Sequence, residues 1–136
     1  MRVLFADAFY WIALLNPKDE NYQKVKAFNR TLTQTRLVTT DEVLTKFLNF
    51  YSSYNPQMRK NAVNRIDDIL NNKIVQIIPQ KRESFMTGLT LYKQRLDKGY
   101  GLTDCISMVA MRQLEINQVL THDKHFRQEG FIILFE

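Results

Sequence analysis

The pattern of apolar and polar positions predicts short strands that alternate with helices. Segments between the strands repeat apolar residues at helical spacing, and residue 17 and residue 79 are prolines that end such elements. The predicted strands span residues 2–6, 37–38, 74–78, 118–120 and 131–135. The predicted helices span residues 9–15, 20–33, 41–50, 56–70, 84–96 and 103–114. The strand segments are continuously apolar, which is typical of burial on both faces. We therefore predict an α/β fold with a parallel sheet of about five strands and helices on both faces.

Length and composition add that this fold forms one domain. The chain of 136 residues contains no repeat, linker or low-complexity segment, so we expect a single domain over residues 1–136. Its 45% hydrophobic residues suffice for a core. The longest apolar run, residues 9–15, is too short for a membrane span, and residues 1–5 do not resemble a signal peptide. With a single cysteine, Cys105, the chain is expected to be cytoplasmic.

Three aspartates occupy positions where a parallel sheet gathers its site residues. Asp7 directly follows the first predicted strand, and Asp123 closely follows the fourth. Asp104 lies in the first turn of a helix after a glycine-containing loop. Ligand sites in open sheets form outside the carboxyl ends of the strands. The sequence therefore predicts that these side chains meet at one edge of the sheet.

Clustered carboxylates favour metal chemistry over nucleophilic or thiolate chemistry. Mg²⁺ and Mn²⁺ prefer hard oxygen ligands, and such ions activate water and neutralise phosphate charge. The net charge of +5 suits a polyanionic substrate, because basic surfaces attract phosphate backbones. The alternative for each aspartate is that it only caps a helix or a turn. For Asp104, capping and metal binding are compatible.

Four segments together resemble the PIN-domain family, and more narrowly its VapC-type toxins. They are FADAFYWIAL (5–14), VTTDEVL (38–44), LTDCIS (102–107) and LTHDKHF (120–126), in this order. The resemblance covers essentially the whole chain. It implies a doubly wound parallel sheet and a Mg²⁺- or Mn²⁺-dependent endoribonuclease that hydrolyses RNA. It also implies a homodimer neutralised by a small antitoxin encoded beside it. Asp7, Asp104 and Asp123 match three acidic positions of the family, which implies that they are both the metal ligands and the catalytic residues.

The fourth acidic position of the family is not acidic in this chain. The resemblance places a glutamate six residues after the capping threonine, which corresponds to Lys46. Glu42 lies one turn earlier and is an alternative fourth acid. The spacing from Thr39 to Glu42 also fits a capping box, and Glu42 with Lys46 fits an i,i+4 ion pair. We favour the capping interpretation. Lys46 is expected to weaken metal binding.

The remaining candidates have simpler explanations. His122 and His125 are expected to lie in a surface loop that contacts RNA or to have no role, because no further histidine or cysteine ligands accompany them. Cys105 is expected in the core, and Thr103 and Ser107 beside Asp104 are candidates for orienting ligands or for capping. Basic residues that could line an RNA groove are Lys93, Arg95, Lys98, Lys124 and Arg127.

Two alternatives to the nuclease toxin follow from these features. A degenerate PIN domain would bind RNA or a protein partner without cleaving it, and Lys46 favours this alternative. A flap- or exonuclease-like enzyme acting on DNA is less favoured, because the chain lacks room for helices that grip a DNA junction.

Overall fold

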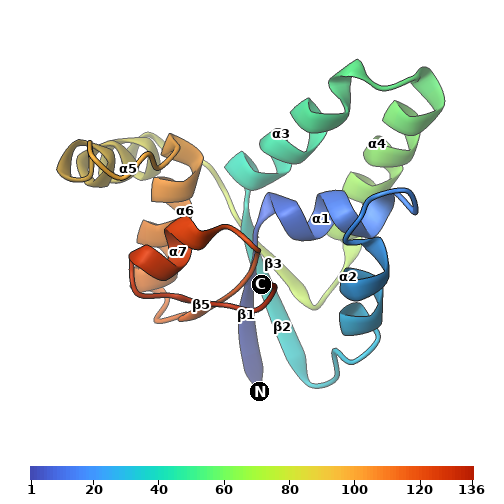
Figure 1. Ribbon diagram of the computed structural model, residues 1–136, viewed down its shortest axis with the longest axis horizontal. Helices are drawn as coiled ribbons and strands as arrows, with labels where there is room; N and C mark the ends of the chain where they lie inside the picture. Colours follow the sequence, from blue (N-terminus) through green and yellow to red (C-terminus); the bar gives the residue numbers. More distant parts are fainter.

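The computed structural model describes all residues, Met1–Glu136, and its centre is a five-stranded sheet (Figure 1). All neighbouring strands are parallel, in the order β3-β2-β1-β4-β5. The strands are β1 (Arg2–Ala6), β2 (Thr35–Thr40), β3 (Val75–Ile78), β4 (Gln118–Leu120) and β5 (Ile132–Ile133). This confirms the predicted α/β fold with a parallel sheet of five strands.

Seven α-helices and one 3₁₀ helix connect the strands. They are α1 (Ala8–Leu15), α2 (Tyr22–Asn29), α3 (Asp41–Phe50), η1 (Tyr51–Ser53), α4 (Pro56–Asn71), α5 (Arg82–Gln94), α6 (Leu102–Gln113) and α7 (Lys124–Gln128). The prediction omitted α7, because a helix of five residues is too short to show a periodic pattern. It also made β2 too short, because Thr35, Thr39 and Thr40 are polar yet buried in the strand.

The helices cover both faces of the sheet, as predicted. Figure 1 shows α1 to α4 on one side of the sheet and α5 to α7 on the other. Helices α5 and α6 approach each other closely at Gly88, where an added Cβ would lie 2.4 Å from Cγ1 of Ile106. A larger residue at position 88 would therefore displace α6, which carries Asp104 two residues before Ile106.

The sheet reverses its strand order beside β1. Strands β2 and β3 follow β1 on one side of it. The chain then crosses back over β1 and adds β4 and β5 on its other side. Asp7 follows β1, and the segment from Thr121 to Asp123 follows β4. Ligands of open parallel sheets bind outside the carboxyl ends of the strands at such a switch point. The fold thus brings the ends of β1 and β4 together where a site is expected.

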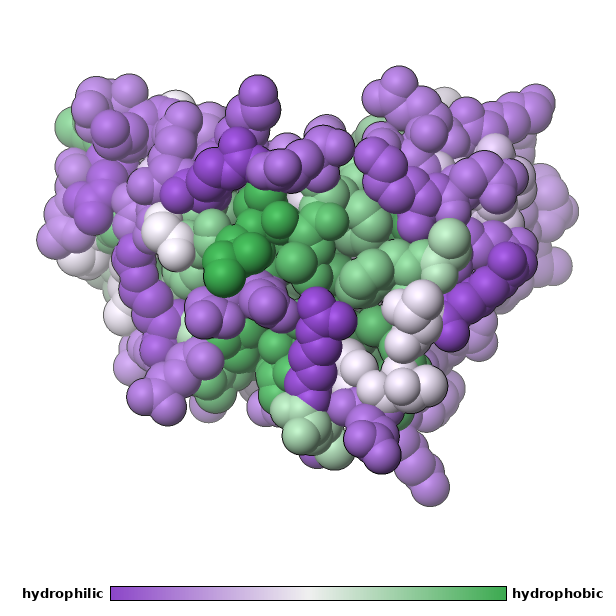
Figure 2. All heavy atoms as spheres, turned by 60° about the horizontal axis from the view of Figure 1, so that its bottom comes forward, coloured by the Kyte–Doolittle hydropathy of each residue, from purple (hydrophilic) through white to green (hydrophobic).

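Apolar side chains fill the layers on both sides of the sheet. Leu4 and Phe5 of β1 are fully buried, and Cys105 of α6 is buried as expected. Figure 2 shows an apolar area framed by hydrophilic side chains on the face that includes the bottom of Figure 1. No helix combines the length and the apolar character that a membrane span requires.

Candidate metal centre and active site

Asp7 is held in place by a residue of a neighbouring strand end. The residue is 4% exposed, and its side chain makes no capping hydrogen bond to α1, although Asp7 occupies the N-cap position. Instead, Thr121 after β4 donates a hydrogen bond of 2.9 Å from Oγ1 to Oδ2 of Asp7. Oδ1 is buried and has no hydrogen-bond partner. Capping of a helix therefore does not explain this aspartate.

Asp104 combines a helix-start contact with a free oxygen. It is the third residue of α6, which begins at Leu102 rather than at the predicted Thr103. Oδ2 accepts a hydrogen bond of 3.4 Å from the backbone N–H of Gly101. Oδ1 is buried without a hydrogen-bond partner, in a residue that is 5% exposed. One oxygen of Asp104 thus stabilises the helix start, and the other accepts no hydrogen bond.

Asp123 caps the short helix α7 and is more open to solvent. Its Oδ1 accepts a hydrogen bond of 2.9 Å from the backbone N–H of His125, and 32% of its side chain is exposed. Thr121 Oγ1 accepts a hydrogen bond of 3.2 Å from the backbone N–H of Asp123. Since the same hydroxyl donates to Asp7, Thr121 links the loops that carry two of the three aspartates.

The structure brings the aspartates to one edge of the sheet but adds a histidine to them. One ligand atom each of Asp104, Asp123 and His125 lie within 4.8 Å of one another. Asp7 is outside this group of three, but it is close enough for its charge to raise the pKa of Asp104. The predicted roles of Asp7, Asp104 and Asp123 in metal binding and catalysis stay a prediction.

Burial and the repulsion of neighbouring carboxylates raise the pKa of Asp7 and the pKa of Asp104. Burial, reinforced by the charge of Asp7, raises the pKa of Asp104 to about 6. Burial also raises the pKa of Asp7. The positive charge of Lys46 acts in the opposite direction on both groups. The ionised cluster is therefore costly in the protein alone, and a bound cation would relieve this cost.

The donor set fits a divalent metal ion. Asp7 Oδ1 and Asp104 Oδ1 are buried carboxylate oxygens that lack any hydrogen-bond donor. Such atoms are nearly always paired in folded proteins, because an unpaired buried polar atom costs free energy. Oxygen ligands of this kind are those that Mg²⁺ and Mn²⁺ prefer.

Lys46 points toward the cluster from α3. Its Nζ lies 3.9 Å from Oδ1 of Asp104, and half of its side chain is exposed. The predicted ion pair between Lys46 and Glu42 is wrong, since Lys46 pairs with Asp104 and Glu42 forms no ion pair. The negative potential of the buried aspartates explains this choice of partner.

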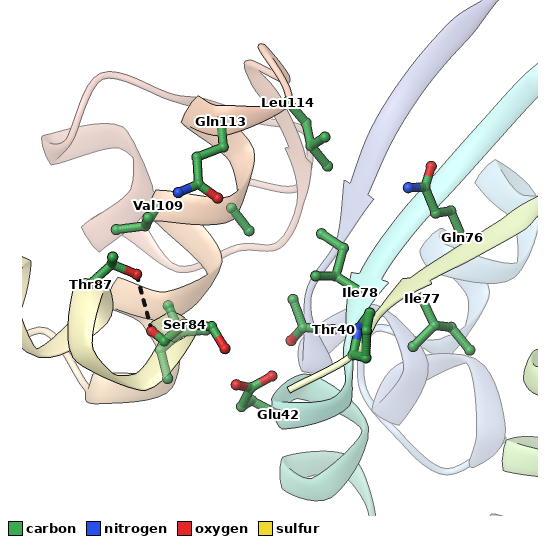
Figure 3. Close-up of a pocket in the computed structure, with 13 residues that line it drawn as sticks. Thr40, Glu42, Gln76, Ile77, Ile78, Ser84, Thr87, Val109, Gln113 and Leu114 are labelled. Atoms are coloured by element: carbon green, nitrogen blue, oxygen red, sulfur yellow. Dashed lines mark hydrogen bonds between the residues drawn. The ribbon is translucent and has the colours of Figure 1, made fainter. Parts of the chain in front are cut away.

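Glu42 lies on another side of α3. It lines a cavity of about 250 Å³ between the start of α3, β3, α5 and α6. Figure 3 shows its carboxylate in the gap between α3 and α5. The predicted capping box with Thr39 is also wrong. Thr40 is the N-cap and accepts a hydrogen bond of 3.1 Å from the backbone N–H of Val43, while Thr39 donates to the carbonyl oxygen of Ala6.

The two histidines lie in different surroundings. His122 stacks on Phe9 with ring centroids 4.2 Å apart. His125 lies in the acidic group, with Nδ1 buried and without a hydrogen-bond partner. The prediction for His125 did not place it among the acidic residues. The sequence did contain a signal, because His125 follows Asp123 by two residues. When an aspartate caps a helix, the residue two positions later lies in the first turn, and its side chain can approach the aspartate.

Part of the predicted basic groove serves the fold instead. Arg95 donates a hydrogen bond of 2.6 Å to Glu129, and Arg112 binds the other oxygen of the same carboxylate at 2.6 Å. Arg127 pairs with Glu136 near the carboxyl end of the chain. These contacts hold α5, α6 and α7 together and remove Arg95 and Arg127 from the set of free cations.

Comparison with protein families matches residues 4–131 to the PIN domain. A search of curated proteins found no match. Among solved structures, the chain resembles VapC20 of Mycobacterium tuberculosis, described as a toxin that cleaves the sarcin–ricin loop. The TM-score is 0.84 at 19% identity, over 95% of this chain and 96% of that one. VapBC2 of Rickettsia felis, solved with a DNA fragment from their promoter, matches with a TM-score of 0.67 at 13% identity, over 98% of both chains. FitAcB of Neisseria gonorrhoeae matches with a TM-score of 0.64 at 14% identity, over 98% of this chain and 96% of that one. At these identities the likeness shows a shared fold.

Proposed function

This chain belongs to the PIN-domain family, and on that premise we propose that it is a Mg²⁺- or Mn²⁺-dependent endoribonuclease. Its biological role in this proposal is the toxin of a toxin–antitoxin pair acting in the cytoplasm. One observation carries the proposal. Two buried carboxylate oxygens, from Asp7 and Asp104, lack partners at the switch point of a parallel sheet. That arrangement suits a divalent cation better than it suits the fold alone.

In the proposed site, Asp7, Asp104 and Asp123 hold the metal and are the catalytic residues. Thr121 fixes the carboxylate of Asp7 through Oδ2, and Gly101 does the same for Asp104. Both contacts leave Oδ1 free for a cation. A bound divalent ion supplies positive charge at a phosphodiester and a more acidic water for hydrolysis.

The charge distribution supports an RNA substrate. The chain carries a net charge of +5 but gathers aspartates at one edge of the sheet. A basic surface binds the phosphate backbone by releasing counterions, so we expect the affinity for RNA to fall steeply with salt. Lys98 and Lys124 are exposed cations on the segments that flank Asp104 and Asp123.

The proposed partners are a small antitoxin and a second copy of this chain. The structural likeness to VapBC2 of Rickettsia felis supports the first partner, because the name VapBC2 stands for a complex of two proteins. Expression of the chain alone should arrest growth, and co-expression of a short neighbouring reading frame should restore it. A homodimer should appear in sedimentation analysis at twice the mass of 16.1 kDa.

The decisive experiment is cleavage of a labelled RNA by the purified protein. We expect cleavage with Mg²⁺ or Mn²⁺, none in EDTA, and a loss of at least roughly a hundredfold in Asp104→Asn, which removes a ligand charge. Asp67→Asn is the matched control, because Asp67 is an exposed acid on α4. Cleavage that persists in EDTA, or in Asp104→Asn at the rate of the control, would refute the proposal.

One observation favours the alternative of a PIN domain that binds without cleaving. Lys46 Nζ lies 3.9 Å from the unpartnered oxygen of Asp104, where a cation would otherwise bind. In that case the protein would bind RNA or a protein partner, and adding metal would not produce cleavage. The same labelled RNA, followed by gel shift and by cleavage, distinguishes the two functions.

A further inference from the structure

His125 is directed at the acidic cluster by the turn that precedes it. The backbone N–H of His125 donates to Oδ1 of Asp123, which fixes the first turn of α7. Its Nδ1 lies 3.3 Å from Oδ1 of Asp123 and 3.9 Å from Oδ2 of Asp104. Despite this proximity, Nδ1 is buried and has no hydrogen-bond partner. The nitrogen is therefore close to two carboxylates without being committed to either.

The imidazole ring is supported from behind. The ring of Tyr100 packs on it with centroids 5.3 Å apart. Tyr100 is itself held by a hydrogen bond of 3.2 Å from its hydroxyl to Glu129, the carboxylate that Arg95 and Arg112 also bind. This chain of contacts limits the rotation of His125. A side chain held in this way is pre-organised to bind a ligand with little loss of entropy.

We propose that His125 supplies Nδ1 as a nitrogen ligand, together with Asp104 and Asp123, and that this selects Mn²⁺ and other transition ions over Mg²⁺. The inference rests on the proposed metal-dependent function. Mg²⁺ takes oxygen ligands in a strict octahedron, whereas imidazole nitrogen suits the later first-row ions. A site with two carboxylates and one imidazole within 4.8 Å therefore has a mixed donor set. Asp7 lies outside this group, but its Oδ1 is a further buried oxygen without a hydrogen-bond partner.

Metal binding, measured without any RNA, tests this inference. Mn²⁺ and Mg²⁺ are titrated separately into the wild-type protein, His125→Ala and His122→Ala. His122 is the matched control, because it lies on Phe9 outside the cluster. We expect His125→Ala to weaken Mn²⁺ binding by about tenfold or more, the loss usual when a metal site loses a supporting group, and to change Mg²⁺ binding much less. His122→Ala should match the wild type with both ions.

Electron spin-echo spectroscopy of bound Mn²⁺ reports the ligand directly. We expect ¹⁴N modulation from a coordinated imidazole in the wild type and in His122→Ala, and its loss in His125→Ala. If His125→Ala does not fold, His125→Gln replaces it, and circular dichroism checks both variants. Mn²⁺ bound without a ¹⁴N signal, or an equal loss of Mn²⁺ and Mg²⁺ affinity, overturns the inference and leaves an all-oxygen metal site.

The outcomes separate this inference from the proposed nuclease activity. Nitrogen-coordinated Mn²⁺ in a protein that fails to cut RNA would support the role of His125 and contradict the nuclease proposal. Cleavage of RNA with Mg²⁺ and Mn²⁺ at equal affinity, with no nitrogen signal, would support the nuclease and contradict the role of His125. A wild-type protein that binds neither ion contradicts both.

Discussion

Replacing Lys46 tests whether the ammonium beside Asp104 limits cation binding. Nζ of Lys46 lies 3.9 Å from Oδ1 of Asp104. At about this distance two unit charges interact by about 1 kcal/mol in water and about 4 kcal/mol at an effective dielectric constant of about 20. Because half of the Lys46 side chain is exposed, solvent screening places the effect near the lower value. Lys46→Met should therefore tighten Mn²⁺ binding roughly fivefold to tenfold, since about 1.4 kcal/mol corresponds to tenfold.

Lys46→Glu should have the larger effect, because it reverses the charge and adds an oxygen donor. We expect a gain of roughly 25-fold to a hundredfold in metal affinity, which is about twice the free energy of the neutral substitution. Calorimetric titration with Mn²⁺ measures the affinity, and cleavage of one labelled RNA at limiting metal measures the rate. Lys73→Met is the control, because Lys73 is exposed at the amino end of β3, away from the site. Equal affinities for Lys46, methionine and glutamate at this position would refute the electrostatic reasoning.

The remaining predictions concern stability. Burial and then the charge of Asp7 raise the pKa of Asp104 to about 6. The folded protein therefore holds a proton on Asp104 more tightly than the unfolded chain does, and the stability that this gives below about pH 4 is lost as the pH rises through 6. Asp104→Asn should therefore raise the free energy of unfolding of the metal-free protein at pH 7.5 by about 2–3 kcal/mol, measured with urea, and an unchanged midpoint would contradict this. Burial favours a raised pKa for Glu129, but hydrogen bonds from Arg95 and Arg112 outweigh it and hold the pKa below its usual range. Glu129→Gln should cost about 2 kcal/mol at pH 7, and this difference should shrink as the pH falls from 4.5 through the lowered pKa of wild-type Glu129. Equal unfolding midpoints of the wild type and Glu129→Gln at pH 7 would show that the contacts of Arg95 and Arg112 with this carboxylate do not stabilise the fold.

The place of each strand in the chain and the edge that carries the candidate site were predictable, because both depend on simple patterns. The apolar run of β1 predicted a buried strand. The acid that follows it at once, Asp7, marked the carboxyl end of this strand as the place of the candidate site. The helix α7 was not predictable, because five residues give no period. Its start depends on one hydrogen bond from the backbone of His125 to Asp123.

The choice of partners around α3 could not be predicted from local spacing. Thr39 and Thr40 are both suited to capping, and only the neighbouring strand decides between them. Thr39 faces Ala6 of β1 and donates to its carbonyl oxygen, which leaves Thr40 to cap the helix. Likewise, Glu42 is the local partner of Lys46 by spacing, but Asp104 attracts the ammonium from a helix 58 positions later in the chain. Long-range electrostatics therefore overrode the i,i+4 rule.

Lys46 and His125 both lie beside Asp104, so both influence which cation would bind at the proposed site. The two oxygens of this carboxylate face different neighbours. Oδ1 lies near the ammonium of Lys46, and Oδ2 lies near Nδ1 of His125. With all three aspartates ionised and one ammonium beside them, two net negative charges remain, which would balance one divalent cation. Mg²⁺ dehydrates reluctantly and keeps several waters, so it would gain little from a nitrogen ligand at this site. A neutral nitrogen ligand adds affinity without adding charge, and it does so for transition ions in particular. In the proposed metal site, the lysine that lowers the negative potential on one side of Asp104 would therefore increase the dependence of metal binding on the histidine at the other.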